Sequence, residues 1–116
     1  MFSYAEYRNI ISLVKQNLPI MDFSEVSDEI NSFCVLRHDI EFSIDRALTM
    51  ARIEHDELGV HSTYTVQLRN NSYNALSQKN IEAIQEIDAM GHYIGLHQNP
   101  PKMSDDHLID YIMKDI

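Results

Sequence analysis

The feature that most constrains this fold is a repeated change of hydrophobic period along the chain. Short apolar runs typical of β-strands alternate with longer segments whose apolar residues recur at helical spacing. The strand-like runs are SFCVLRHDI, VHSTYTVQL and HYIGLH, and a helical pattern follows each of them. This alternation predicts right-handed βαβ units and a parallel sheet. The first run, placed at 33–38, has the continuous apolar pattern of a strand that is buried on both faces.

Serine, proline and glycine mark the ends of the predicted helices. Three helices are expected to run from a serine N-cap to a breaker: Ser3 to Pro19, Ser43 to Gly59 and Ser77 to Gly91. A fourth begins at Ser104, and Ile116 still lies on its apolar stripe. We therefore expect one α/β domain over residues 1–116, with three parallel strands alternating with helices, as the N-terminal portion of a larger domain. A small complete three-layer domain is the alternative.

Composition excludes several classes of partner. The formal net charge is −9, so there is no basic field to attract nucleic acid or an anionic membrane surface. No apolar run reaches the ~18 residues that span a bilayer, and the N-terminus does not resemble a signal peptide. The only cysteine, Cys34, lies in an apolar run and is interpreted as a small buried hydrophobe. These features predict a cytoplasmic protein.

Polar side chains gather where the predicted strands end. In α/β folds the ligand site lies at the carboxyl ends of the strands, so polar residues there are the first candidates for function. They are Arg37, His38, Asp39, Glu41, Arg69, Asn70, His97 and Asn99. Of these, Arg37, Arg69 and Asn70 are the candidates for contacts with a substrate.

Two carboxylates and one histidine in this set suit metal-assisted hydrolysis. Asp39 and Glu41 are spaced i, i+2, so an extended backbone would point both to one side. One carboxylate can ligate a divalent metal while the other accepts a proton, and His97 can add an imidazole ligand. The structural alternatives are a helix-capping or turn role for the two acids and a hydrogen-bonded strand-end role for the histidine.

The other histidines and acids have simpler interpretations. His92 begins the third strand, away from the site, and is expected to hydrogen-bond a nearby group. His38 should point opposite to Asp39 and have a packing or orienting role. Acidic runs such as EHDE are expected to form solvated helix faces.

The segments LRHDIEFSIDRALTMARIEHDELGVHSTYTVQLRNNSYN and AMGHYIGLH resemble the amino-terminal part of the polysaccharide deacetylase family, the chitooligosaccharide deacetylase homology domain. The similarity covers about residues 33–100 and is greatest to the bacterial branch associated with surface polysaccharide and lipopolysaccharide. It implies a partial (β/α) barrel and metal-dependent hydrolysis of acetyl groups on a sugar or polysaccharide. It also implies that Asp39 is the catalytic base, that Glu41, His97 and Asn99 hold the metal, and that the metal is zinc.

The chain departs from the family pattern in three places. The second acid is usually aspartate, and Glu41 is one methylene longer. Classical members have a second histidine where this chain has Pro101, and members of the nearest branch often have aspartate where this chain has Asn99. A site of Glu41, His97 and Asn99 would carry one negative charge rather than two and should bind zinc less tightly.

Two functions from different classes follow from these residues. One is a sugar deacetylase, and the other is a deacetylase-fold module that binds carbohydrate or a partner without hydrolysing it. An unrelated nucleotide-binding or receiver domain fits poorly, because RHDIEFS has no glycine with which to build a phosphate loop.

Overall fold

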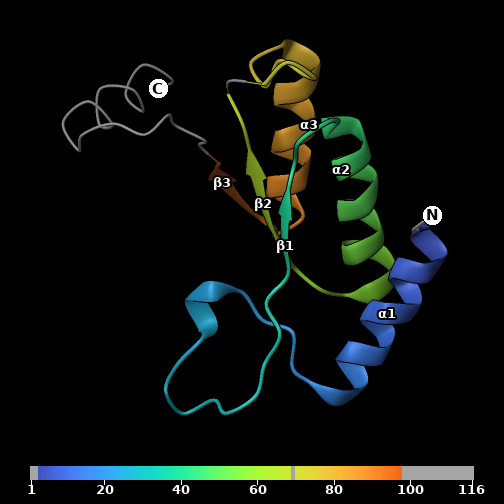
Figure 1. Cartoon of the computed structure of the whole chain (residues 1–116), viewed down its shortest axis with the longest axis vertical. Coiled ribbons are helices and arrows are strands. Elements are labelled where there is room, and N and C mark those ends of the chain that lie inside the picture. Colours follow the sequence, from blue (N-terminus) through green and yellow to red (C-terminus); the bar gives the residue numbers. More distant parts are fainter. Residues whose placement is uncertain (1–2, 69, 98–116) are drawn as a thin grey trace.

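The computed structural model describes residues 3–68 and 70–97, and this part of the chain is a mixed α/β structure built on one parallel sheet (Figure 1). The strands are β1 (Arg37–Asp39), β2 (Thr63–Val66) and β3 (Tyr93–Leu96). They lie in the order β1-β2-β3, and both pairings are parallel. The expected three parallel strands that alternate with helices are therefore confirmed.

The three expected helices that lie in this part of the chain also form. They are α1 (Tyr4–Asn17), α2 (Ile44–Arg52) and α3 (Gln78–Ala89), and α2 continues into one π-helical segment, η2 (Ile53–Leu58). A short 3₁₀ turn, η1 (Phe23–Glu25), precedes the sheet. The hydroxyls of Ser3, Ser43 and Ser77 each accept a hydrogen bond from the backbone N–H three residues later, so the predicted N-caps are confirmed.

Two glycines end helical segments in the left-handed region that other residues rarely adopt. Gly59 has a φ of 63° after η2, and Gly91 has a φ of 94° just after α3. A side chain at such a φ is strained by contact with its own backbone. Both predicted stops are therefore confirmed, and they have a conformational cause.

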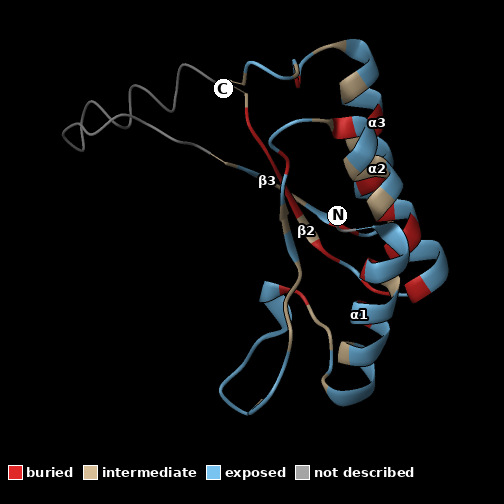
Figure 2. Cartoon of the chain, turned by 45° about the vertical axis from the view of Figure 1, so that its right-hand side comes forward, coloured by how far each residue is buried: buried red, intermediate tan, exposed pale blue. Residues whose placement is uncertain are grey.

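The helices cover one face of the sheet, and the hydrophobic core lies between this face and the helices (Figure 2). Tyr64 and Val66 of β2 point into this core, where they join side chains of α2 and α3 such as Ile44 and Ile87. A second apolar cluster joins α1, through Tyr7 and other residues, to η2. None of the described helices covers the opposite face of the sheet, and we call this the open face.

The prediction of a strand at 33–38 that is buried on both faces is wrong. The strand β1 begins only at Arg37, and both Arg37 and Asp39 are exposed. Upstream of it, Cys34 forms an isolated parallel bridge with Ile20, and the Phe33 side chain is exposed. The reason is that, within the described part of the chain, β1 has one hydrogen-bonded neighbour and one face without a helix, so it needs no continuous apolar sequence.

Two further expectations concern the last predicted helix and the membrane spans. The predicted helix that begins at Ser104 lies outside the described residues. Among the helices of the described part, none is both long and apolar enough to cross a membrane.

Candidate functional site

A group of polar side chains lies on the open face near the carboxyl ends of the strands. Asp39 of β1 is in register with Thr65 of β2, which is in register with Gly95 of β3. His97 follows β3 by one residue, and its backbone N–H donates to the carbonyl of Val66. Through this register the structure places Asp39 and His97 at the same edge of the sheet, on the two strands that flank β2.

The Asp39 carboxylate is held through one of its two oxygens. Thr65 Oγ1 donates to Asp39 Oδ1 over 2.6 Å, and Arg37 Nε donates to the same oxygen over 2.7 Å. The Thr65 and Arg37 hydrogen bonds hold the pKa of Asp39 below its usual range. The other oxygen, Oδ2, receives no hydrogen bond from the described residues and belongs to a side chain that is 35% exposed. Asp39 is therefore an oriented, ionised carboxylate with one oxygen available.

His97 is positioned by a chain of amide side chains. The Gln67 amide nitrogen lies 3.4 Å from His97 Nδ1, and Gln67 Oε1 accepts from Asn70 Nδ2 over 2.7 Å. Asn70 Nδ2 also donates to the Glu41 carbonyl, and Asn70 Oδ1 accepts from the backbone N–H groups of Ser72 and Tyr73. The Asn70 side chain, predicted to contact substrate, thus holds the loops after β1 and β2 in place.

Glu41 does not extend the β1 alternation. The strand ends at Asp39 and the chain bends at Glu41, and both residues line a cavity between the end of β1 and the first turns of α2. Carboxylate and imidazole are suitable donors for zinc, but residues 3–68 and 70–97 bring no three His, Cys, Asp or Glu side chains close enough to hold a metal ion. The described donors therefore fit zinc in kind, and the predicted ligand Asn99 and the predicted substrate contact Arg69 lie outside the described residues.

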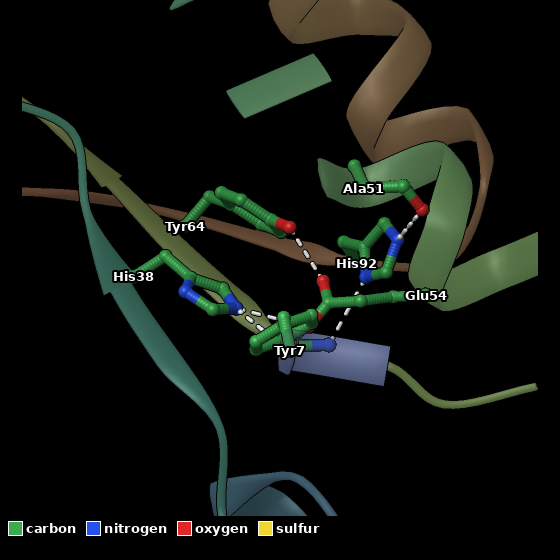
Figure 3. Close-up of polar contacts among 7 residues, drawn as sticks. Tyr7, His38, Ala51, Glu54, Tyr64 and His92 are labelled. Atoms are coloured by element: carbon green, nitrogen blue, oxygen red, sulfur yellow. Dashed lines mark hydrogen bonds and ion pairs between the residues drawn. The ribbon is translucent and has the colours of Figure 1, made fainter. Parts of the chain in front are cut away.

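A second polar cluster lies on the other side of the sheet, centred on a buried carboxylate (Figure 3). Glu54, in η2, is 0% exposed. Its Oε2 accepts from Tyr7 Oη and Ser62 Oγ, both over 2.5 Å, and lies 2.9 Å from His38 Nε2. Its Oε1 accepts from Tyr64 Oη over 2.5 Å. We call these five residues the Glu54 cluster.

The protonation states in the Glu54 cluster follow from these contacts. Burial acts to raise the pKa of Glu54, but the hydrogen bond and charge of His38, aided by the Ser62 and Tyr64 hydroxyls, hold it below its usual value. Burial and the Glu54 charge raise the pKa of Tyr7 and of Tyr64, so both phenols keep their protons. The ionised carboxylate of Glu54 accepts a hydrogen bond from all four donors, so each of these polar side chains has a partner.

His92 has the structural role expected for it. Its Nδ1 accepts from the Ser62 backbone N–H and its Nε2 donates to the Ala51 carbonyl, each over 3.0 Å (Figure 3). The ring is 2% exposed, and burial lowers its pKa. It is therefore a neutral imidazole that joins the end of α2 to the start of β2.

The expectation that EHDE forms a solvated helix face is wrong at its first residue. Glu54 is fully buried, whereas His55, Asp56 and Glu57 are exposed. A signal was present in the sequence: Glu54 lies three residues after Ala51 and four before Leu58, on the apolar stripe of the predicted helix. A charged residue on an apolar stripe indicates a buried and paired charge.

Comparison of the chain with protein-family models, with curated protein sequences and with solved structures finds no match. The function must therefore be argued from the site itself.

Proposed function

We propose that this chain is a deacetylase-like domain, part of a (β/α) barrel, that hydrolyses acetyl groups on a sugar or polysaccharide in the cytoplasm. The observation that supports it best is the placement of Asp39 and His97 on the open face, at the carboxyl ends of β1 and β3, the two parallel strands that flank β2. In a closed barrel the face opposite the helices is the interior, and catalytic side chains of such folds project from the carboxyl ends of the strands that surround it.

Asp39 is the residue to which we assign proton transfer. Its pKa lies below the usual range, so the carboxylate is ionised at neutral pH, and Oδ2, which accepts no hydrogen bond from the described residues, can accept a proton. A carboxylate of low pKa is a weak base, so it suits a water or hydroxyl whose own pKa has been lowered. Arg37 and Thr65 fix the orientation of this oxygen.

The resemblance implies that a divalent metal supplies Lewis-acid chemistry at this site. The described residues do not complete a set of ligands, and the role of Glu41, His97 and Asn99 as ligands stays a prediction. The departures from the family pattern at Glu41, Asn99 and Pro101 favour the second candidate function, a deacetylase-fold module that binds carbohydrate without hydrolysis.

Acetate release and metal content test the two functions together. The purified protein is incubated with chitin oligosaccharides and with O-acetylated sugars, before and after chelation, and the variant Asp39→Asn is compared with Asp56→Asn, which changes an exposed carboxylate outside the site. We expect metal-dependent acetate release that falls at least 100-fold in Asp39→Asn and is unchanged in Asp56→Asn. Sugar binding with neither acetate release nor bound metal would overturn the enzyme and support the module.

A further inference from the structure

The amide side chain of Asn70 is fixed in one orientation. Its Oδ1 accepts from the backbone N–H groups of Ser72 and Tyr73, over 2.6 and 3.3 Å. A backbone N–H can only donate, so the atom that faces these two groups must be the oxygen. The amide nitrogen, Nδ2, lies on the other side, where it donates to the Glu41 carbonyl over 2.9 Å and to Gln67 Oε1 over 2.7 Å.

The orientation of Asn70 determines that of Gln67. The Asn70 amide nitrogen only donates, so the Gln67 atom beside it must be the acceptor oxygen. A rotated Gln67 amide would place two NH₂ groups 2.7 Å apart and break this hydrogen bond. Gln67 is 9% exposed, and its backbone N–H donates to Tyr73 Oη, which anchors the residue further. The amide nitrogen of Gln67 therefore faces His97.

An NH₂ group beside His97 selects one tautomer of the neutral imidazole. The hydrogen bond at one ring nitrogen of a histidine decides which nitrogen carries the proton. The Gln67 amide nitrogen lies 3.4 Å from His97 Nδ1 and can only donate, so Nδ1 must be the unprotonated acceptor. The proton of the neutral ring is then on Nε2.

We infer that Gln67 is a positioning residue that holds His97 as a hydrogen-bond donor, with its proton on Nε2. Gly95 is in register with Thr65, whose hydroxyl bonds Asp39 on the open face. Strand alternation places His97, two residues after Gly95, on the same face. The open face then presents an acceptor, Asp39 Oδ2, and a donor, His97 Nε2–H, to a ligand.

This arrangement is the reverse of the one that a zinc ligand needs. A histidine that binds a metal usually donates its other ring N–H to an oxygen, which leaves the ligating nitrogen unprotonated. The group beside Nδ1 of His97 is the NH₂ of Gln67 and not its oxygen. Zinc at Nε2 would therefore require the Gln67 amide to turn and lose the hydrogen bond from Asn70.

As a donor, His97 can serve the proposed reaction directly. Its Nε2–H can hydrogen-bond the carbonyl oxygen of an acetyl group as negative charge develops on that oxygen. Only this contact with substrate rests on the proposed function. The tautomer of His97 rests on the contacts of Asn70 and Gln67.

Long-range ¹H–¹⁵N spectra of the labelled full chain test the inference, because they show which imidazole nitrogen carries the proton. They are recorded at pH 8.5, about two units above the ordinary pKa of histidine, so that imidazoles are neutral. We expect wild-type His97 to be protonated at Nε2. Gln67→Glu keeps the acceptor for Asn70 but places an oxygen beside Nδ1, so Nδ1 should gain the proton. The ratio of the two tautomers should change about tenfold, as expected for one hydrogen bond.

Two more variants separate the amide relay from a simple effect of charge. Asn70→Asp removes the NH₂ that holds Gln67, so the Gln67 amide should turn and His97 should again gain a proton on Nδ1. Gln78→Glu introduces the same charge at an exposed position at the start of α3, and it should leave the tautomer of His97 unchanged.

Three results would overturn the role of Gln67. They are a wild-type His97 with its proton on Nδ1, the same tautomer in wild type and Gln67→Glu, or an equal change in Gln78→Glu. Acetate release by the same samples reports on the proposed function separately. A tautomer that depends on Gln67 without acetate release would reject only the deacetylase, and acetate release with a tautomer independent of Gln67 would reject only this inference.

Discussion

The buried carboxylate of Glu54 should contribute a large share of the stability of this fold, and Glu54→Gln tests this with almost no change of shape. The amide oxygen can take the place of Oε2 and keep Tyr7, His38 and Ser62 as partners. These three hydrogen bonds then lose the charge that strengthens them, about 1 kcal/mol each. The amide nitrogen faces Tyr64 Oη, whose proton loses its acceptor at a cost of about 1–3 kcal/mol.

One effect opposes these losses, because a neutral amide is less costly to bury than a carboxylate. We therefore expect a net loss of about 3 kcal/mol in the free energy of unfolding, near the lower end of what breaking a buried ion pair costs. Urea unfolding followed by far-UV circular dichroism measures it. Glu57→Gln is the matched control: Glu57 lies in the same segment, pairs with Arg8 on the surface over 2.9 Å, and should change stability by less than about 1 kcal/mol.

The pH dependence gives an independent check on Glu54. Its pKa is lower in the folded chain than its ordinary value of 4.5, so its stabilisation is fully present above pH 4.5 and is lost as the pH falls through the folded-state pKa. The stability difference between wild type and Glu54→Gln should therefore shrink below pH 4.5. A difference under 1 kcal/mol at pH 7, or one that does not change with acidification, would refute an ionised Glu54.

Two further predictions concern the turn at Gly59 and the buried imidazole of His92. Gly59→Ala should lower the free energy of unfolding in urea by about 1–2 kcal/mol, because φ is 63° at this residue. The control Gly95→Ala should lower it less, because Gly95 has an ordinary φ and an added Cβ would lie 3.5 Å from Thr65 Cγ2. Equal losses in the two variants would argue against strain at Gly59. The pKa of His92 is lowered in the folded chain. The stability that the neutral ring contributes is therefore complete above pH 6.5, its ordinary pKa, and is lost as the pH falls below 6.5. Stability measured from pH 7 to 5 should thus fall less steeply in His92→Gln than in wild type or in the exposed control His55→Gln, and parallel slopes would contradict a neutral His92.

Local sequence predicted the elements of this fold well because their ends depend on neighbouring residues. A serine hydroxyl that bonds an N–H three residues on, as at Ser43, or a glycine at positive φ, as at Gly59, acts within one turn. The strand β1 was misplaced because its apolar residues meet partners elsewhere: Leu36 packs on the cluster between α1 and η2.

The candidate site was predicted only as far as strand order determines it. Parallel strands bring their carboxyl ends to one edge, so the proximity of Asp39 and His97 could be expected. The position of Glu54 on the apolar stripe indicated a buried charge, but its partners could not be predicted, because they come from α1, β1 and β2, up to 47 residues away. The position of Glu41 also depended on a bend after β1 that the i, i+2 spacing does not reveal.

The two polar clusters are connected by strand alternation. His38 is in register with Tyr64, and Asp39 with Thr65. His38 and Tyr64 contact Glu54 on the helix side, while Asp39 and Thr65 bond each other on the open face. Whatever fixes the first pair also fixes the backbone from which the second pair projects. The buried charge of Glu54 therefore holds β1, which has one hydrogen-bonded neighbour among the described strands, in the register that orients the Asp39 carboxylate.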